Sequence, residues 1–305
     1  MYLHRLSLLI ELKRSGTIAA VGEALHYSPS GVSQQLAILE TEVGYKLLER
    51  VGRRVRFTRA GDLLCLRAES ILHELDSAMA DVAALHDSVR GTVRFAAYQS
   101  FNLMFLPDLL RGFADWPELT ITMKQMEPEV SIPALMDNRL DVVVSERYNG
   151  DDEQLPLELQ EGLLFEEQLY LATPADMAAT EVTEHSQSVW ALEPMGARSR
   201  RWSTMVCRSH GFEPVVHFEN HDMLMNLALV RAGVAISFVP GAVRHIADLD
   251  GVRLTPLPDQ VRRVSTITKK ISLAYPGITA TVEALRGLAE LVQDRDFLSQ
   301  AAETA

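Results

Sequence analysis

The chain has only two cysteines, Cys65 and Cys207, in 305 residues. Two isolated cysteines cannot build the disulfide framework that stabilises small secreted proteins. They also lack the close Cys and His spacing that a structural zinc site requires. The sequence therefore predicts a protein of a reducing compartment, with no bound metal ion and no cofactor.

Long hydrophobic runs are also absent. Apolar stretches such as Leu8-Leu9-Ile10 and Val142-Val143-Val144 are far shorter than the roughly 20 residues that a membrane-spanning helix needs. The N-terminal apolar segment is interrupted by Glu11 and Lys13, and no small-residue cleavage site follows it, unlike a secretory signal. We therefore expect a cytoplasmic protein that does not associate with a membrane.

Signatures of catalysis are missing too. The sequence contains no nucleophile elbow, phosphate-binding loop, zinc-binding helix or paired-carboxylate motif. One run of metal-ligand side chains, residues 217–222, holds two histidines and two carboxylates. A predicted strand-to-helix junction separates His217 from His221, so we expect no metal site there. The sequence predicts that the protein is not an enzyme.

Positive charge is scarce, and the net charge of −12 at first argues against a nucleic-acid partner. The distribution of charge changes this interpretation. Residues 1–59 carry nine Lys and Arg against five Asp and Glu, whereas residues 91–305 carry 18 against 30. A basic N-terminal module on an acidic body is typical of a DNA-binding head joined to a sensor. The length of the chain predicts two or three domains.

The N-terminal module, residues 1–59, is predicted to begin with three helices. An amphipathic helix covers about the first 14 residues, and Thr17 can cap a second helix over residues 18–25. Ser28 can cap a third helix, residues 29–42, which has proline at its first position. The exposed face of this third helix carries hydroxyl and amide side chains, namely Ser30, Ser33, Gln34 and Gln35. Such a helix can enter a major groove and read base edges.

Residues 50–59 contain five arginines. Val55 and Phe57 alternate with arginine and threonine after Gly52, which predicts a hairpin with an arginine-bearing outer face. Guanidinium groups bind phosphate through paired N–H donors. The three helices and this hairpin together predict a winged helix-turn-helix that binds double-stranded DNA. The predicted DNA contacts are Thr17, Ser28, Pro29, Ser30, Ser33, Gln34, Arg50, Arg53, Arg54 and Thr58.

Residues 15–64 resemble the DNA-binding domain of LysR-type regulators. The matching positions are Gly16-Thr17 with Ala19-Ala20, then Ser28, Val32, Ser33, Gln35, Leu36, Leu39, Glu40, Gly44, Leu47, Leu48, Arg50, Arg54, Val55, Phe57, Thr58, Ala60 and Gly61. Three positions depart: Gly22 replaces the usual alanine, Leu48 replaces phenylalanine, and Pro29-Ser30-Gly31 replaces Gln-Pro-Ala. The last departure alters a base-reading side chain, and so the operator preference. The resemblance implies a transcription regulator at promoter operators, with RNA polymerase as a candidate partner.

Residues 60–90 predict a linker and dimerisation helix. Its apolar stripe consists of Leu64, Ala68, Ile71, Leu75, Ala78, Val82, Leu85 and Val89. A helix of this length, about 45 Å, cannot bury such a stripe against itself, so pairing with a second copy is expected. The alternative is a helix that lies on its own domain. The sequence predicts a homodimer or a homotetramer.

After Gly91, apolar alternation typical of strands interleaves with helical periodicity, which predicts an α/β domain with a largely parallel sheet. The predicted strands cover residues 93–97, 119–123, 140–144, 169–172, 189–192, 215–218, 234–239 and 270–275. The predicted helices cover residues 101–114, 130–138, 199–210, 222–231 and 278–294.

This part is similar to the LysR effector domain, a two-lobed fold of the type II periplasmic-binding-protein class. Residues 229–240 match a family segment, with Ala235 where a second glycine is usual. The resemblance implies a lobe I of residues 91–163 and 267–305 and a lobe II of residues 164–266. The lobes would be joined by crossings near residues 162–166 and 265–269.

Ligands of such folds bind between the lobes, where strands end and helices begin. By position, the resemblance suggests a pocket formed by Ser100, Phe101, Pro128, Gly196, Ala197 and His221. Arg198, Arg200 and Arg201 could hold a carboxylate, so a carboxylate or an amino acid is the expected effector. Plain helix capping, packing or solvation remains open for each of these residues. A pure solute-binding protein and an architectural DNA protein are the competing functions, and each leaves one half of the chain without a role.

Overall fold

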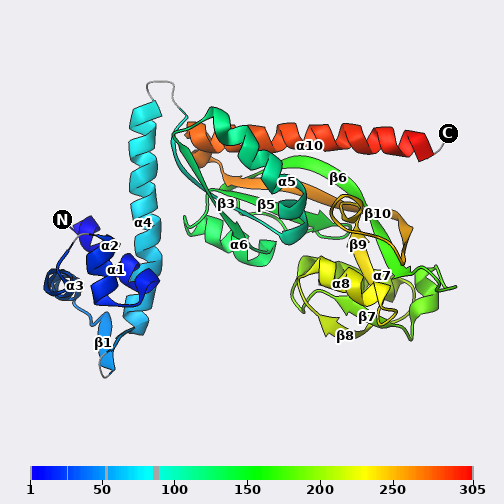
Figure 1. Ribbon diagram of the computed structural model, residues 1–305, viewed down its shortest axis with the longest axis horizontal. Coiled ribbons are helices and arrows are strands. Elements are labelled where there is room, and N and C mark those ends of the chain that lie inside the picture. Colours follow the sequence, from blue (N-terminus) through cyan, green and yellow to red (C-terminus); the bar gives the residue numbers. More distant parts are fainter. Residues whose placement is uncertain (1, 26, 52–53, 85–88, 304–305) are drawn as a thin grey trace. The chain divides into compact units, whose positions relative to one another are not determined.

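The computed structural model describes residues 2–25, 27–51, 54–84 and 89–303, and it divides the chain into two compact units near residue 85. The first unit is a helical head with a long helix, and the second is an α/β domain (Figure 1). The two-part architecture predicted from the sequence is confirmed.

The head follows the predicted order of helices and hairpin. Its elements are α1 (Tyr2–Ser15), α2 (Ile18–Ala24), α3 (Pro29–Val43), β1 (Leu48–Val51), β2 (Arg54–Phe57) and α4 (Arg59–Ala84). Leu6, Val32 and Leu39 are fully buried where α1, α3 and their neighbours meet. Their burial fixes the opposite face of α3 toward solvent.

Two predicted caps define the ends of the short helices. The Thr17 hydroxyl accepts a hydrogen bond from the Ala20 amide at 3.2 Å, and the Ser28 hydroxyl accepts one from the Gly31 amide at 3.1 Å. Gly22 faces the turn between α2 and α3, and a Cβ there would lie 2.6 Å from the Tyr27 carbonyl oxygen. This close approach explains why glycine replaces the alanine that the LysR pattern has at this position.

The wing is a two-stranded antiparallel hairpin, in which Leu48 pairs with Phe57. It begins at Leu48, ahead of the arginine-rich segment. Arg53 lies outside the described residues, as do the side chains of Arg50 and Arg54. Arg56 is exposed and donates two hydrogen bonds to the Glu49 carboxylate at 2.8 and 2.6 Å.

The long helix α4 serves two purposes along its length. Cys65 and Ala68 are buried in the core of the head, whereas Ile71 and Leu75 are 45% and 41% exposed. The first part therefore lies on its own domain, and Ile71 and Leu75 beyond it are exposed. The prediction that this helix continues to residue 90 is wrong, because Val89 is not helical and packs into the core of the second unit.

The second unit is built on a six-stranded sheet in the order β4-β3-β5-β10-β6-β9. These strands are β3 (Gly91–Ala97), β4 (Leu119–Gln125), β5 (Val142–Tyr148), β6 (Leu159–Pro174), β9 (Ser237–Pro240) and β10 (Val252–Lys269). β3 pairs in parallel with β4 and β5, but β10 runs antiparallel to both β5 and β6. The sheet is therefore mixed, and the prediction of a largely parallel sheet is wrong. The reason is that β10 returns from late in the chain to lie between β5 and β6.

Alternating side chains of the sheet bury against helices on both faces. The covering helices are α5 (Gln99–Gly112), α6 (Pro128–Met136) and α10 (Pro276–Glu303). Phe95 and Val142 pack in the same core as side chains of α5 and α10, whereas Ala96 and Val143 pack with those of α6. We call this part lobe I. Along its strands, successive apolar side chains point to opposite faces of the sheet.

Lobe II is built around a second, two-stranded parallel sheet. Its further elements are β7 (Val189–Leu192), α7 (Arg198–Ser209), β8 (Val215–Glu219), α8 (Met223–Arg231) and α9 (Val243–Ile246). Trp190 is fully buried at the centre of its core. The long strands β6 and β10 run from lobe I into lobe II (Figure 1). They contain the two segments predicted as crossings.

The predicted strand over residues 270–275 is wrong. Ile271–Ala274 forms a 3-10 helix, and Ile271 is 76% exposed. The last strand is β10, which begins at Val252, in a stretch where no strand was predicted. Its prolines at 256 and 258 are typical of a loop, and a register shift between Pro256 and Val261 accommodates them. Within the described ranges, no helix combines the length and apolarity needed to cross a bilayer.

Candidate functional site

The first two turns of α3 present a polar, uncharged surface. Ser30, Ser33 and Gln34 are exposed there. The Ser33 hydroxyl donates to the Pro29 carbonyl at 3.0 Å, a bond that leaves its lone pairs free to accept. Gln35 is drawn inward, because the Arg5 guanidinium donates to its side-chain oxygen at 2.9 Å. The structure therefore exposes three of the four polar side chains predicted for the outer face of α3, and Gln35 is half-buried.

Other predicted DNA contacts have structural partners within the head. The Thr58 hydroxyl donates to the Lys46 carbonyl at 2.7 Å and accepts from the Gly61 amide at 3.1 Å. It therefore begins α4 and closes the wing. Thr17 and Ser28 are the caps described above.

In the second unit, loops that follow four strands line a cavity between the lobes. Tyr98 follows β3, Glu127 follows β4, Glu193 follows β7 and His221 follows β8. Parallel neighbours end at the same edge of a sheet, which brings these loops together. The space among the lining residues, including its mouth open to solvent, is about 630 Å³.

The polar wall of this cavity is acidic, and we call the cavity the acidic cleft. Glu127, Glu146 and Glu193 line it together with His221. Three side-chain atoms that could bind a ligand lie within 4.8 Å of one another, one each from Glu127, Glu193 and His221. The Nδ1 atom of His221 lies 3.4 Å from the Glu193 carboxylate, and this contact raises the pKa of His221.

Arg262 joins the carboxylates at the floor of the acidic cleft through hydrogen bonds. Its guanidinium donates to the Glu146 carboxylate at 2.7 Å and to the Glu167 carboxylate at 2.6 and 2.9 Å. Arg262 is 4% exposed and Glu146 is 3% exposed, so this is a buried ion-pair network. Ser100 adds an oxygen 3.3 Å from the same guanidinium.

The structure brings only two of the predicted pocket residues into the acidic cleft, Ser100 and His221. Phe101 is buried in the core of lobe I. Pro128 and Arg198 line a different depression, beside α6. Ala197 is buried at the start of α7, and Gly196 is exposed with a φ of 102°.

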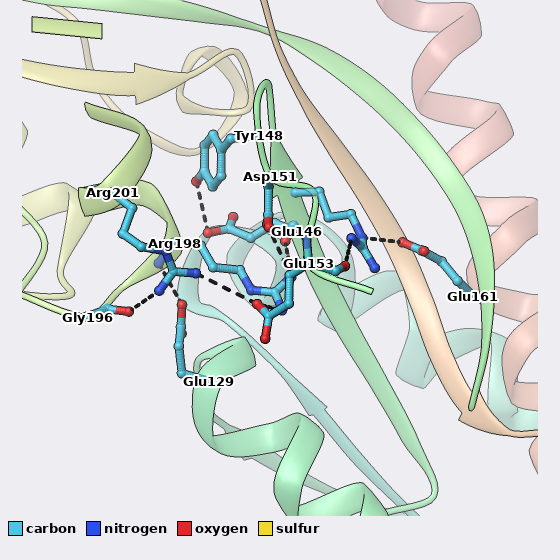
Figure 2. A network of polar contacts seen from close by, with 10 residues as sticks. Glu129, Glu146, Tyr148, Asp151, Glu153, Glu161, Gly196, Arg198 and Arg201 are labelled. Carbon is cyan, nitrogen blue, oxygen red and sulfur yellow. Dashed lines mark hydrogen bonds and ion pairs between the residues drawn. The ribbon is translucent and has the colours of Figure 1, made fainter. Parts of the chain in front are cut away.

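The three arginines considered for a carboxylate effector already have protein partners. The Arg198 guanidinium lies 3.1 Å from Glu153 and 3.5 Å from Asp151, and Arg201 donates to the Gly196 carbonyl (Figure 2). Arg200 donates to the Glu219 carboxylate at 2.9 Å. These arginines hold lobe II together and hold it against lobe I.

The acidic residues of the cleft were missed by the sequence analysis, although a signal for them existed. Glu193 directly follows the predicted strand 189–192, and Glu127 lies four residues beyond the predicted strand 119–123. Ser100 and His221 each lie three residues beyond a predicted strand. Arg262 had no such signal, because it lies within the strand that was not predicted.

The ionisation of Glu127 makes the stability of the folded protein depend on pH. Burial, followed by repulsion from Glu193 and Glu146, raises the pKa of Glu127 from the ordinary 4.5 to about 8. The folded protein thus retains a proton that the unfolded chain has lost. The resulting stabilisation is full below pH 4.5 and is lost as the pH rises through 8.

We therefore expect Glu127→Gln to raise the melting temperature of the ligand-free protein, because glutamine stays neutral. The difference in melting temperature between the variant and the unchanged protein should grow by about 5 °C between pH 6 and pH 8 and should stay constant above pH 8. Thermal unfolding across this range measures it, with the exposed Glu166→Gln as a control that should show no such trend. A constant difference at all pH values would contradict the assignment.

The comparisons with known proteins agree with this architecture. Residues 3–62 match the family model described as "Bacterial regulatory helix-turn-helix protein, lysR family", and residues 86–296 match the "LysR substrate binding domain". The fold is similar to the crystal structure of CbnR, a LysR family transcriptional regulator. The TM-score is 0.71 at 23% identity, covering 95% of this chain and 99% of that one.

Curated relatives have low identity but match over most of their length. The transcriptional dual regulator GltC of Bacillus subtilis (strain 168) is 24% identical over 292 residues, which is 94% of this chain and 91% of GltC. The regulator GltR of the same organism is 23% identical, covering 94% of this chain and 96% of GltR. The protein therefore belongs to the LysR family of bacterial helix-turn-helix regulators, and it is a DNA-binding transcriptional regulator with a domain for a small-molecule effector.

Proposed function

We propose that this regulator reads operator DNA with the first two turns of α3 and grips the flanking phosphates with its wing. The observation that carries this proposal is the exposed Ser30, Ser33 and Gln34 surface on a helix whose opposite face is locked in the core of the head. Short hydroxyl and amide side chains suit base edges in the major groove. Arg50, Arg53 and Arg54 are the proposed phosphate contacts.

We infer that the protein acts as a homodimer or homotetramer in the cytoplasm. Leu63, Ile71 and Leu75 of α4 are 58%, 45% and 41% exposed, and a second copy would cover them. Two heads would then meet two half-sites of an inverted repeat. RNA polymerase is the candidate partner at the promoter.

The effector is proposed to bind in the acidic cleft, between lobe I (residues 91–163 and 267–305) and lobe II (residues 164–266). Contacts across the cleft already link the lobes: the Gln99 side chain donates to Asp222 at 3.0 Å, and the Arg198 amide donates to Glu129 at 2.6 Å. A ligand that favours one arrangement of the lobes shifts the population toward it, and so changes the spacing of the heads.

Of the two effector classes expected from the sequence, the amino acid suits the acidic cleft better. A lone carboxylate would meet Glu127, Glu146 and Glu193, and the Arg198 guanidinium is already paired with protein carboxylates. The ammonium group of an amino acid would find acceptors in the same place.

Selection of genomic fragments by the purified full chain, read by sequencing, tests the proposed function. We expect a few fragments to be enriched at moderate salt and to share an inverted repeat. Enrichment without any shared sequence would contradict sequence-specific regulation. The genes beside the enriched sites would also indicate the effector.

The Ser33→Ala variant tests the reading face. We expect it to lower the affinity for an enriched fragment by about 1 kcal/mol or more, with little change for unrelated DNA. Thr41→Ala is the matched control, because its hydroxyl also bonds to the carbonyl four residues earlier but lies two turns further along α3. Gel-shift titrations measure the affinity of each variant for the enriched fragment and for unrelated DNA. Equal losses of affinity for the enriched fragment in the two variants would contradict the assignment of Ser33 to the DNA-reading face.

A further inference from the structure

The acidic cleft holds more negative charge than its own positive groups balance. Arg262 is the only Lys or Arg among the described residues that line it, and this one guanidinium serves both Glu146 and Glu167. The side chain of Glu127 makes no hydrogen bond to any described residue. Among the described residues, the His221 imidazole is the one basic group in ion-pair contact with the Glu193 carboxylate.

A buried hydroxyl on the same wall lacks a partner. The Tyr98 side chain is 3% exposed, and its hydroxyl oxygen makes no hydrogen bond with the described part of the chain. A buried polar group without a partner is costly, so an unpaired hydroxyl that lines a cavity indicates a group that arrives with the ligand. Burial is also the main reason that the pKa of Tyr98 is raised, so its proton stays in place.

Two of the helix N-termini at the cleft, those of α7 and α8, already have side-chain acceptors. The N-terminus of α5, which also lines the cleft, has no side-chain cap. The amide of Arg198, at the start of α7, donates to the Glu129 carboxylate at 2.6 Å. At the start of α8, the Met223 amide donates to Gln99, and the Leu224 and Met225 amides donate to Asp222. Side-chain oxygens of the protein thus satisfy donors at the starts of α7 and α8 that could otherwise bind a ligand anion.

The remaining wall suits a carbon skeleton. Trp202 and Phe238 pack edge to face with ring centroids 5.2 Å apart, and Tyr148 stacks on Trp202 at 5.2 Å. All three line the cleft, together with Leu169 and Leu192. Aromatic faces beside carboxylates are the usual surroundings of an organic cation, whereas a bare metal ion would leave most of this wall without a contact.

We infer that the acidic cleft binds an organic amine through its positive charge, with the ammonium group held between the Glu127 and Glu193 carboxylates and the carbon skeleton against Trp202 and Phe238. The Tyr98 hydroxyl and the serine hydroxyls of the cleft are available to further polar groups of the ligand. The role of this amine as effector rests on the proposed function, but its binding does not.

The affinity for the amine should depend on pH, because Glu127 must lose its proton to carry the negative charge. The groups that face Glu127 are Glu129, Glu146, Glu193 and His221, with Tyr98 further along the wall. At low pH, Glu127 is protonated and His221 carries its own positive charge, so the amine has a weaker partner. We expect amine affinity to rise between pH 6 and pH 8.5, over which alkylamines stay charged.

A matched set of five-carbon probes tests the inference on the full-length protein by calorimetry. The probes are 1-aminopentane, 1,5-diaminopentane, 1-pentanol, pentanoate and glutarate. We expect both amines to bind at least tenfold more tightly than the alcohol, and the two anions to bind more weakly than the alcohol. Glu127→Gln and Glu193→Gln should each lower amine affinity about tenfold, and the exposed Glu166→Gln should leave it unchanged.

Three outcomes would overturn the inference. One is amine binding no tighter than alcohol binding, including no binding of either amine up to 20 mM. Another is amine affinity that survives in the Glu127→Gln, Glu193→Gln double variant. The third is Zn²⁺ or Mn²⁺ alone saturating the Glu127, Glu193 and His221 cluster while amines do not compete, since that result would make it a metal site.

Binding to an enriched DNA fragment, measured on the same preparations without ligand, separates this inference from the proposed function. Specific DNA binding without amine binding would overturn the inference alone. Amine binding without specific DNA binding would overturn the proposed function and leave the amine site standing. Thermal unfolding of each glutamine variant verifies that it is folded.

Discussion

Replacing Arg262 with methionine is expected to lower the free energy of unfolding of the effector domain by about 3–5 kcal/mol. Arg262 is 4% exposed and is shared by the Glu146 and Glu167 carboxylates. Methionine has a similar length but no charge, so the variant leaves both carboxylates buried without a counter-ion. Removing one partner of a buried ion pair is far more costly than removing the whole pair.

Denaturant unfolding followed by tryptophan fluorescence measures this effect selectively. All three tryptophans, at positions 116, 190 and 202, belong to the effector domain. Arg263→Met is the matched control, because Arg263 is the next residue of β10 and pairs with Glu166, but its side chain is 62% exposed. Exposed pairs contribute about 0–1 kcal/mol.

The triple variant Arg262→Met, Glu146→Gln, Glu167→Gln should recover part of the lost free energy of unfolding, since it also removes the two unpaired carboxylate charges. Equal losses in Arg262→Met and Arg263→Met would show that the buried network is not what stabilises the floor of the acidic cleft.

Gly61→Ala is expected to destabilise the DNA-binding head by about 2–4 kcal/mol. A Cβ at Gly61 would lie 2.1 Å from the Leu47 carbonyl oxygen and 3.0 Å from its carbon. That carbonyl cannot retreat easily, because it accepts the hydrogen bond of the Thr58 amide at 2.9 Å. The start of the wing and the start of α4 would have to separate.

Amide hydrogen exchange on the full chain locates this effect. Peptides from α1 and α3 should exchange about 30-fold faster or more, whereas peptides from the effector domain should be unchanged. Gly287→Ala is the control, because Gly287 lies within a helix with nothing within 4 Å of the added methyl group. It should be neutral or slightly stabilising. Unchanged exchange in the head of Gly61→Ala would contradict the close contact.

The head was predictable because its signals are local. Ser28 followed by Pro29, the apolar spacing of Val32, Leu36 and Leu39, and the alternation in the wing each specify a structure within a few residues. The comparisons confirm the resulting domain, which matches a family model over residues 3–62. Gly22 was visible as a departure from the LysR pattern, but only the path of the Tyr27 carbonyl explains it.

The strand β10 shows where local signals mislead. Its prolines at 256 and 258 and its arginines at 262 and 263 are typical of a surface loop. The strand nevertheless forms, because β5 and β6 offer backbone partners on both sides and a register shift absorbs the prolines. The stretch 270–275 has the composition of a strand, but Ile271–Ala274 forms a 3-10 helix that links β10 to α10.

The sequence by itself therefore determined the class of protein, the order of its domains and the polar exposed face of α3, since each depends on neighbours along one helix or hairpin. Only the tertiary structure decided the acidic character of the cleft between the lobes. Glu127, Glu193 and His221 come from three strand ends, and Arg262 comes from a fourth strand far along the chain. Charge at a site is a sum over groups that meet in space, and the acidity of this cleft exists only once those strands are paired.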